Sequence, residues 1–240
     1  MDISELGFDI ISLGHGSGGL MTRELLDSII FKIFSNPYLD QKHDGSLIKV
    51  EGQLAVSTDS FVVSPIFFKG GNIGELAVNG TINDVAMCGA MPKFVSLAFI
   101  VEEGLTVSDF VKIVQSIKNT ADKCGVQIIT GDTKVVERGN GDKIFINTTG
   151  FGPVHPKANI AAAQIKTGDK IIINGLIAQH GMAIMSEREG LEFESSIISD
   201  TTNLNFLIWD LLDRFGDKIH LLRDPTRGGL ASVLSEIATD

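Results

Sequence analysis

Apolar residues recur along the chain with two alternating spacings, one helical and one typical of strands. The clearest helix is segment 106–123, because its apolar residues Phe110, Ile113, Val114, Ile117 and Ala121 fall on one face. Further helical segments are expected at 20–34, 74–87, 180–189, 203–215 and from Gly228 onward. Strands are expected at 8–13, 94–102, 126–130, 144–152, 170–174 and 218–222, with a hairpin at 47–57. This interleaving predicts an α/β or α+β fold.

A domain boundary is expected directly after strand 144–152, where Pro153 and Pro156 interrupt the pattern. The small-residue stretch that follows suits a connection between two domains, so we predict domains at 1–155 and 156–240. The sequence stops after the last expected helix with no strand behind it. We therefore expect the second domain to be incomplete.

Composition narrows the functional classes. The 240 residues carry a formal net charge of −10 and contain no Lys/Arg-rich block, which argues against a nucleic-acid partner. No apolar run approaches the roughly 20 residues of a membrane span, and the acidic N-terminus does not resemble a secretory signal. We expect a cytoplasmic protein without a membrane partner. Cys88 and Cys124 stand apart from other metal-type ligands, so packing is their simplest role.

Four aspartates recur at strand ends or loops beside hydroxyl, amide or glycine residues: Asp59, Asp84, Asp132 and Asp224. Magnesium prefers oxygen ligands and is usually held by a few carboxylates together with phosphate oxygens. The pattern is therefore typical of a magnesium-nucleotide site, although aspartates also cap helices and form turns. Asp84 favours the metal interpretation most, because it interrupts an otherwise apolar segment.

The segment Gly14–Gly19 has the spacing G-x-G-x-x-G and lies between an expected strand and helix. A dinucleotide fold also needs an acidic residue ending a second strand about 20 residues later. Residues 36–40 are polar and have the composition of a loop, so the required second strand is missing and a dinucleotide fold is disfavoured. The sequence contains no Gly-Lys dipeptide and hence no phosphate loop. A glycine loop that approaches a phosphate through its backbone, carrying His15 and Ser17, fits better.

Three further positions each allow a functional and a purely structural interpretation. Gly228 and Gly229 open a helix beside Arg227, which suits either an anion site or an ordinary capped helix start. Lys134 directly follows Asp132-Thr133 and could contact a phosphate, move a proton or only be solvated. His180 could contact a phosphate or simply begin a helix.

Together these motifs resemble the HypE family of hydrogenase maturation factors, in that family's order and over the whole chain. The matching segments are Gly14–Gly19, Thr58–Val63, Gly70–Gly74, Gly80–Met87, Thr130–Val136, Asn147–Gly150 and Arg223–Leu230. The wider superfamily, similar to aminoimidazole ribonucleotide synthetase, shares the spaced aspartates and an ATP site without a phosphate loop.

The resemblance implies a two-domain, PurM-like (aminoimidazole ribonucleotide synthetase-like) architecture whose N-terminal domain forms a β-barrel across a homodimer. It implies ATP with Mg²⁺, and an ATP-dependent dehydration of a C-terminal cysteine S-carboxamide to a thiocyanate. The cyanide then serves the iron of a [NiFe]-hydrogenase. A HypF-like carbamoyl transferase and a HypC–HypD-like iron scaffold are the implied partners.

The resemblance also implies roles for individual residues that match the family's motifs. Asp59, Asp84, Asp132 and Asp224 match metal and nucleotide aspartates, and Lys134 matches a lysine beside the reacting carboxamide. The segment containing Gly16, Ser17, Gly18 and Gly19 matches a mobile loop over the site. The remaining nucleotide-binding candidates in the matching motifs are Asn83, Thr133, Arg227, Gly228 and Gly229.

The sequence departs from the family at its end, where the family has a flexible tail ending in cysteine. Neither Cys88 nor Cys124 matches that residue, so we expect this chain to lack its own substrate group. A tailless ATP-binding and dimerisation module is one alternative. Selenophosphate synthetase would carry a reactive cysteine before Cys88, and thiamine-monophosphate kinase would lack the Gly14–Gly19 loop together with the Arg223–Leu230 motif.

Overall fold

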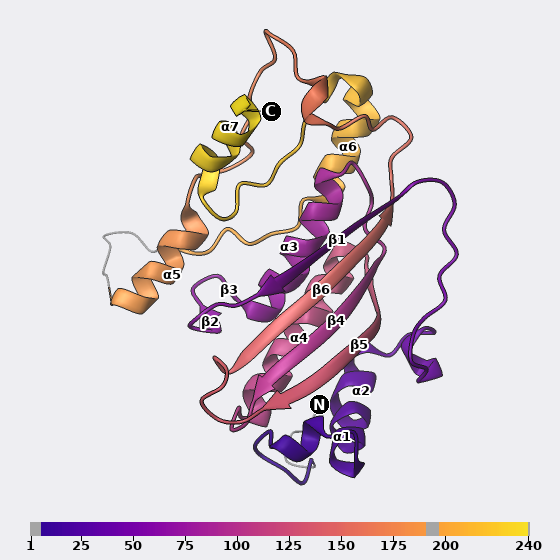
Figure 1. Ribbon diagram of the computed structural model, residues 1–240, viewed down its shortest axis with the longest axis vertical. Helices are drawn as coiled ribbons and strands as arrows, with labels where there is room; N and C mark the ends of the chain where they lie inside the picture. Colours follow the sequence, from indigo (N-terminus) through magenta and orange to yellow (C-terminus); the bar gives the residue numbers. More distant parts are fainter. Residues whose placement is uncertain (1–5, 191–196, 240) are drawn as a thin grey trace.

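The computed structural model describes residues 6–190 and 197–239, and a four-stranded mixed sheet forms its centre (Figure 1). The strands are β1 Leu54–Phe61, β4 Phe94–Glu102, β5 Gln127–Val136 and β6 Ile144–Pro153. Their order across the sheet is β1-β6-β4-β5, with the β4–β5 pair parallel and the other two pairs antiparallel. The short strands β2 Phe67–Phe68 and β3 Gly71–Asn72 form a separate antiparallel pair.

One face of this sheet is covered and the other is open. Helices α3 (Ile73–Met87) and α4 (Val107–Cys124) lie behind the sheet in Figure 1 and pack on the covered face. Burial alternates along β4, as a half-covered strand requires, with Leu97 and Phe99 buried. Ile100 and Val56 are about half exposed on the opposite face. The core therefore lies between the sheet and the two helices.

An N-terminal helical run lies beside the free edge of the sheet at β5. It consists of α1 Leu20–Leu25, a π-helical turn Leu26–Ile30 and α2 Phe31–Phe34. This confirms the predicted segment 20–34, with one wide turn inside it. Single-turn 3-10 helices flank the run at Leu13–Gly16 and Leu39–Gln41.

The C-terminal part contributes α5 Gln179–Glu189, α6 Asn205–Phe215 and α7 Gly229–Thr239, with 3-10 turns at Ala162–Gln164 and Gly216–Lys218. Helix α6 docks on the end of α3 (Figure 1). Its first residue, Asn205, is fully buried and donates from Nδ2 to the Cys124 carbonyl at 3.0 Å. Within residues 6–190 and 197–239, no helix is long and apolar enough to cross a membrane.

Four strand predictions are wrong, because the segments do not form the strand pairs that the prediction requires. Residues 8–13 form only an isolated β-bridge, between Ile10 and Thr106. Their backbone also makes hydrogen bonds to the turn before α4. The hairpin at 47–57 does not form, because β1 pairs with β6 instead. Residues 170–174 and 218–222 lie beside no strand among the described residues, and Ile172 is 87% exposed. A short apolar run becomes a strand only where another strand completes its hydrogen bonds.

Candidate functional site

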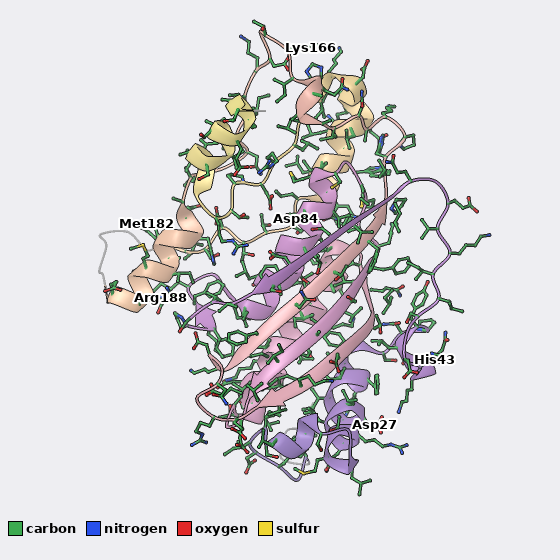
Figure 2. The ribbon with its side chains drawn as sticks, in the orientation of Figure 1. Asp27, His43, Asp84, Lys166, Met182 and Arg188 are labelled. Carbon is green, nitrogen blue, oxygen red and sulfur yellow. The ribbon has the colours of Figure 1, made fainter. Side chains whose placement is uncertain are left out.

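Asp84 lies in the last turn of α3, on the side that faces the coil leading into α7 (Figure 2). Asn72 begins this helix by accepting hydrogen bonds from the backbone N–H groups of Gly74 and Glu75. Ser57 of β1 donates from Oγ to Oδ2 of Asp84 at 2.9 Å. Burial raises the pKa of Asp84, the Ser57 hydrogen bond opposes this rise, and the nearby Asp59 carboxylate adds to it. Asp84 is thus a half-buried carboxylate with one fixed oxygen.

Asp59 is held by the pairing of β1 with β6. Asn147 of β6 donates from Nδ2 to the Asp59 carbonyl and to the Ser60 hydroxyl, both at 3.0 Å. The Asp59 side chain accepts from the Ser60 backbone N–H at 2.7 Å. Its charge contributes to raising the pKa of both Asp84 and Asp224. The three aspartates therefore share one electrostatic environment.

Asp224 reaches this environment from the coil before α7. Burial raises its pKa from 3.8 to about 6, and the Asp84 carboxylate adds to the rise. Arg223 lowers the pKa of Asp84 and Asp224 and binds Glu236 of α7, with Nη2 2.6 Å from Oε2. We refer to Asp59, Asp84 and Asp224 as the three-aspartate cluster. It concentrates negative charge where burial makes that charge costly.

The donor atoms of this cluster suit magnesium. In residues 6–190 and 197–239, no group of three or more His, Cys, Asp and Glu side chains is arranged so that it could hold a metal ion. Magnesium commonly keeps several waters and takes phosphate oxygens, so a few carboxylates are sufficient on the protein side. The three side chains alone therefore form no complete metal site, but their carboxylate oxygens are of the type that magnesium takes together with water and phosphate oxygens.

Asp132 does not join the three-aspartate cluster within one chain. Asp59 pairs with Thr148, Thr148 with Leu97, and Leu97 with Gly131, the residue before Asp132. This row crosses all four strands, so the separation is three strand spacings, or about 14 Å. Asp59 and Asp132 therefore lie on the two edge strands of the sheet, in neighbouring rows.

Lys134 lies with Asp132 on β5. Its Nζ is 2.6 Å from Oδ1 of Asp132, and both side chains are more than half exposed. Lys134 pairs with Ile100, which points to the open face, and paired residues share a face. The intervening Thr133 is buried on the covered side. The predicted catalytic lysine consequently faces the open side of the sheet.

The glycine-rich segment packs against this same edge. A Cβ added to Gly16 would lie 2.4 Å from the Val135 backbone nitrogen, so no larger residue fits without movement. Ser17 donates to the Gly14 carbonyl at 2.9 Å, and the Gly18 N–H donates to Thr22 Oγ1 at 2.9 Å. Gly19 is the N-cap of α1. The structure thus places Gly16 against Val135, the residue that follows Lys134.

A cavity of about 210 Å³ lies between the N-terminal helical run and the edge strand β5. Its lining includes Gly16, Gly18, Asp132 and Lys134, and is mostly apolar. The apolar wall residues are Leu26, Ile30, Phe31, Phe34, Leu39, Leu97, Phe99 and Ile128. The cavity is larger than the engineered apolar cavity of about 150 Å³ that binds benzene. An aromatic group could enter it.

Other predicted nucleotide-binding residues are placed differently. Asn83 accepts from the Leu204 N–H at 2.8 Å and donates to the Thr202 carbonyl at 3.0 Å, so its amide fixes the segment before α6. Arg227 is exposed. Gly228 and Gly229 adopt positive φ angles of 75° and 62° at the start of α7, which favours glycine there. Their nucleotide contacts remain predictions.

No site role was predicted for Ser57 or for Asn147, which heads a family-matching segment, although both hold the aspartates. Ser57 precedes Asp59 by two residues, and in a strand such residues share a face. That spacing could have indicated that Ser57 faces the same helix as Asp59. The position of Asn147 opposite Ser60 depends on the β1–β6 register and has no comparable local signal.

Two family models together match most of the chain. The family described as "AIR synthase related protein, N-terminal domain" matches residues 42–154, and "AIR synthase related protein, C-terminal domain" matches residues 166–240. The fold is therefore the α/β fold of AIR synthase related proteins.

Individual relatives and solved structures show which members of this class the chain resembles. Carbamoyl dehydratase HypE of Rhizobium leguminosarum bv. viciae is 47% identical over 95% of this chain and 66% of its own length. A crystal structure of hydrogenase maturation protein HypE in complex with ATP matches with a TM-score of 0.92 and 47% identity, over 95% of this chain and 68% of that one. A HypE–HypF complex matches with a TM-score of 0.77 and 48% identity, over 90% and 70%.

The chain belongs to the HypE family. It spans about two thirds of the length of the curated relatives that it matches.

Proposed function

We propose that this chain forms the ATP-binding body of a carbamoyl dehydratase that acts in [NiFe]-hydrogenase maturation. The observation that carries the proposal is the three-aspartate cluster, in a chain 47% identical to a HypE solved with ATP. In the proposed reaction, ATP phosphorylates the oxygen of a cysteine S-carboxamide. That oxygen then leaves as phosphate, the nitrogen loses both protons, and a thiocyanate remains. Phosphorylation is needed because an amide oxygen is a poor leaving group.

Magnesium is the metal that we propose for Asp59, Asp84 and Asp224. When bound, it would neutralise charge on the phosphates during transfer. The three carboxylates would hold the ion and orient the phosphates that share it. Lys134 would accept an amide proton or stabilise the transferred phosphoryl group, and Gly16–Gly19 would cover the site.

A homodimer would bring the two parts of the site together. Asp59 of the three-aspartate cluster and the strand that carries Lys134 lie at opposite edges of one sheet, about 14 Å apart by strand spacing. The open face carries half-exposed Val56 and Ile100, which a second copy could cover to form the predicted barrel. We propose that Asp132 and Lys134 of one protomer complete the cluster of its partner.

The wider setting is also part of the proposal. We propose domains at 1–155 and 156–240, a cytoplasmic location, a HypF-like carbamoyl donor and a HypC–HypD-like iron scaffold. The solved HypE–HypF complex supports the first partner. The thiocyanate product is the chemical form in which cyanide could pass to the iron.

The apolar cavity is the proposed site of the adenine base. Phe31, Phe34 and Phe99 offer aromatic contacts, and β5 is an edge strand whose outer backbone groups between Thr130 and Lys134 face this space. Triphosphate leaving the cavity would pass Lys134 and the glycine segment.

Filling the cavity tests this assignment. Ile30→Trp should weaken ATP binding about tenfold or more, because it removes the space for the base, at about 1.4 kcal/mol per factor of ten. Inorganic tripolyphosphate, which has no base, should bind as it does to the wild type. Ile30→Leu keeps the volume and is the matched control. Titration calorimetry measures all three; equal ATP affinity in Ile30→Trp and wild type would move the base elsewhere.

A further inference from the structure

Ser57 is a polar residue of β1 to which the proposed reaction gives no role. Its Oγ lies 2.9 Å from Oδ2 of Asp84, although 27 residues separate the two in sequence. Because Asp84 Oδ2 is an acceptor when ionised, the serine hydroxyl is the donor. This side-chain contact joins the strand carrying Asp59 to the helix carrying Asp84.

Close packing of α3 on the sheet makes the contact possible. A Cβ added to Gly80 would lie 2.8 Å from the Phe61 ring, and one added to Gly150 would lie 3.0 Å from Thr81 and Val85 side-chain carbons. The buried hydroxyls of Thr81 and Thr148 are 2.5 Å apart and tether the helix to β6. The gap between helix and sheet is therefore narrow and fixed, and Ser57 has the length to bridge it.

The contact restricts the Asp84 carboxylate. Rotation about the last bond of an aspartate is broad, so an unpartnered carboxylate samples many orientations. A hydrogen bond to Oδ2 selects one orientation and leaves Oδ1 for another ligand. Mutation of a residue that hydrogen-bonds to a metal-binding side chain typically lowers metal affinity by 10–100-fold.

We propose that Ser57 is a positioning residue that orients Asp84 for a magnesium-bound phosphate ligand. The inference rests on the proposed function for that ligand. The orientation itself is a property of the chain without ligand. The hydroxyl acts through Asp84 and does not itself contact the nucleotide.

Calorimetric titration with Mg²⁺-ATP tests the role. Ser57→Ala should weaken binding about tenfold. Ser57→Thr, which keeps the hydroxyl, should restore it. In an Asp84→Asn background, Ser57→Ala should cause no additional loss, because the residue through which it acts is already changed. An additive loss would mean that Ser57 contacts the nucleotide itself, and an unchanged Ser57→Ala affinity would mean that it positions nothing; either overturns the proposal.

An NMR measurement separates this inference from the proposed function. The side-chain carboxyl-carbon signal of Asp84, assigned by its loss in Asp84→Asn, is followed without nucleotide or metal. Ser57→Ala should shift or broaden that signal, and Ser57→Thr should leave it near its wild-type position. Absence of Mg²⁺-ATP binding in the wild type would refute the proposed function alone. An unshifted, sharp signal in Ser57→Ala would refute the positioning role alone.

Discussion

Asp84→Asn should abolish the thermal stabilisation of this protein by Mg²⁺-ATP. Ligand at 100 times its dissociation constant adds about 2.7 kcal/mol to the free energy of unfolding. For a chain of this size, each kcal/mol raises the melting temperature by roughly 2–4 °C. Asparagine removes the charge that would hold the metal. The shift should therefore be clear in the wild type and absent in the variant, as measured by differential scanning fluorimetry.

The variant itself should remain folded. Asparagine can still accept the Ser57 hydrogen bond, and it removes a half-buried charge near Asp59 and Asp224. Asp122→Asn is the matched control, because Asp122 is an exposed aspartate on α4 paired with Lys118. An Asp84→Asn protein that still responds to Mg²⁺-ATP like this control would remove Asp84 from the site.

Asp224→Asn should stabilise the metal-free protein at neutral pH. The folded-state pKa of Asp224 is about 6, against 3.8 as the ordinary value. The folded protein therefore binds this proton more tightly than the unfolded chain does, so stability from this group falls as the pH rises from about 4 to about 6. Above that window the buried charge costs at most about 3 kcal/mol, at 1.36 kcal/mol per pKa unit. Asparagine removes that cost.

Urea denaturation in the presence of EDTA measures the effect. The gain in free energy of unfolding should be largest near pH 7.5 and about half as large near pH 5, the middle of that window, where Asp224 is mostly neutral in the folded protein but still ionised in the unfolded chain. Arg223 and the two neighbouring aspartates are the charged groups that also act on Asp224. A gain that is the same at both pH values would show that Asp224 does not titrate as the structure indicates.

Long, strongly patterned segments were predictable from the sequence. Strand β4 has the predicted bounds, and α4 begins one residue after the predicted start, with Thr106 as its N-cap. Gly125 ends α4 in the left-handed conformation expected of a C-cap glycine. These elements are predictable from local sequence because their apolar pattern and, for α4, the capping residues at both ends indicate the same structure.

Short apolar runs were not predictable in this way. Residues 8–13, 170–174 and 218–222 have the composition of strands, but a strand exists only through its partner. The Leu47–Ser57 hairpin fails for the same reason: β6 offers β1 eight paired residues. Local sequence contains no information about which distant segment will lie alongside.

The site was predictable as a list of residues and not as an arrangement. Asp84 could be singled out because a carboxylate in an apolar helix needs a partner or a ligand. That Asp59 and Asp132 lie on opposite edges follows from the order β1-β6-β4-β5, which no spacing reveals. Ser57 and Asn147 acquire their roles only through helix–sheet packing and strand register.

Isothermal titration of this chain with ATP, with and without magnesium, tests whether the three-aspartate cluster forms a metal-dependent ATP site. We expect one ATP bound per chain in the presence of Mg²⁺, and much weaker binding both when EDTA removes the metal and in Asp84→Asn. No binding by the wild-type chain at millimolar Mg²⁺-ATP, or binding that is indifferent to both magnesium and Asp84, would contradict it.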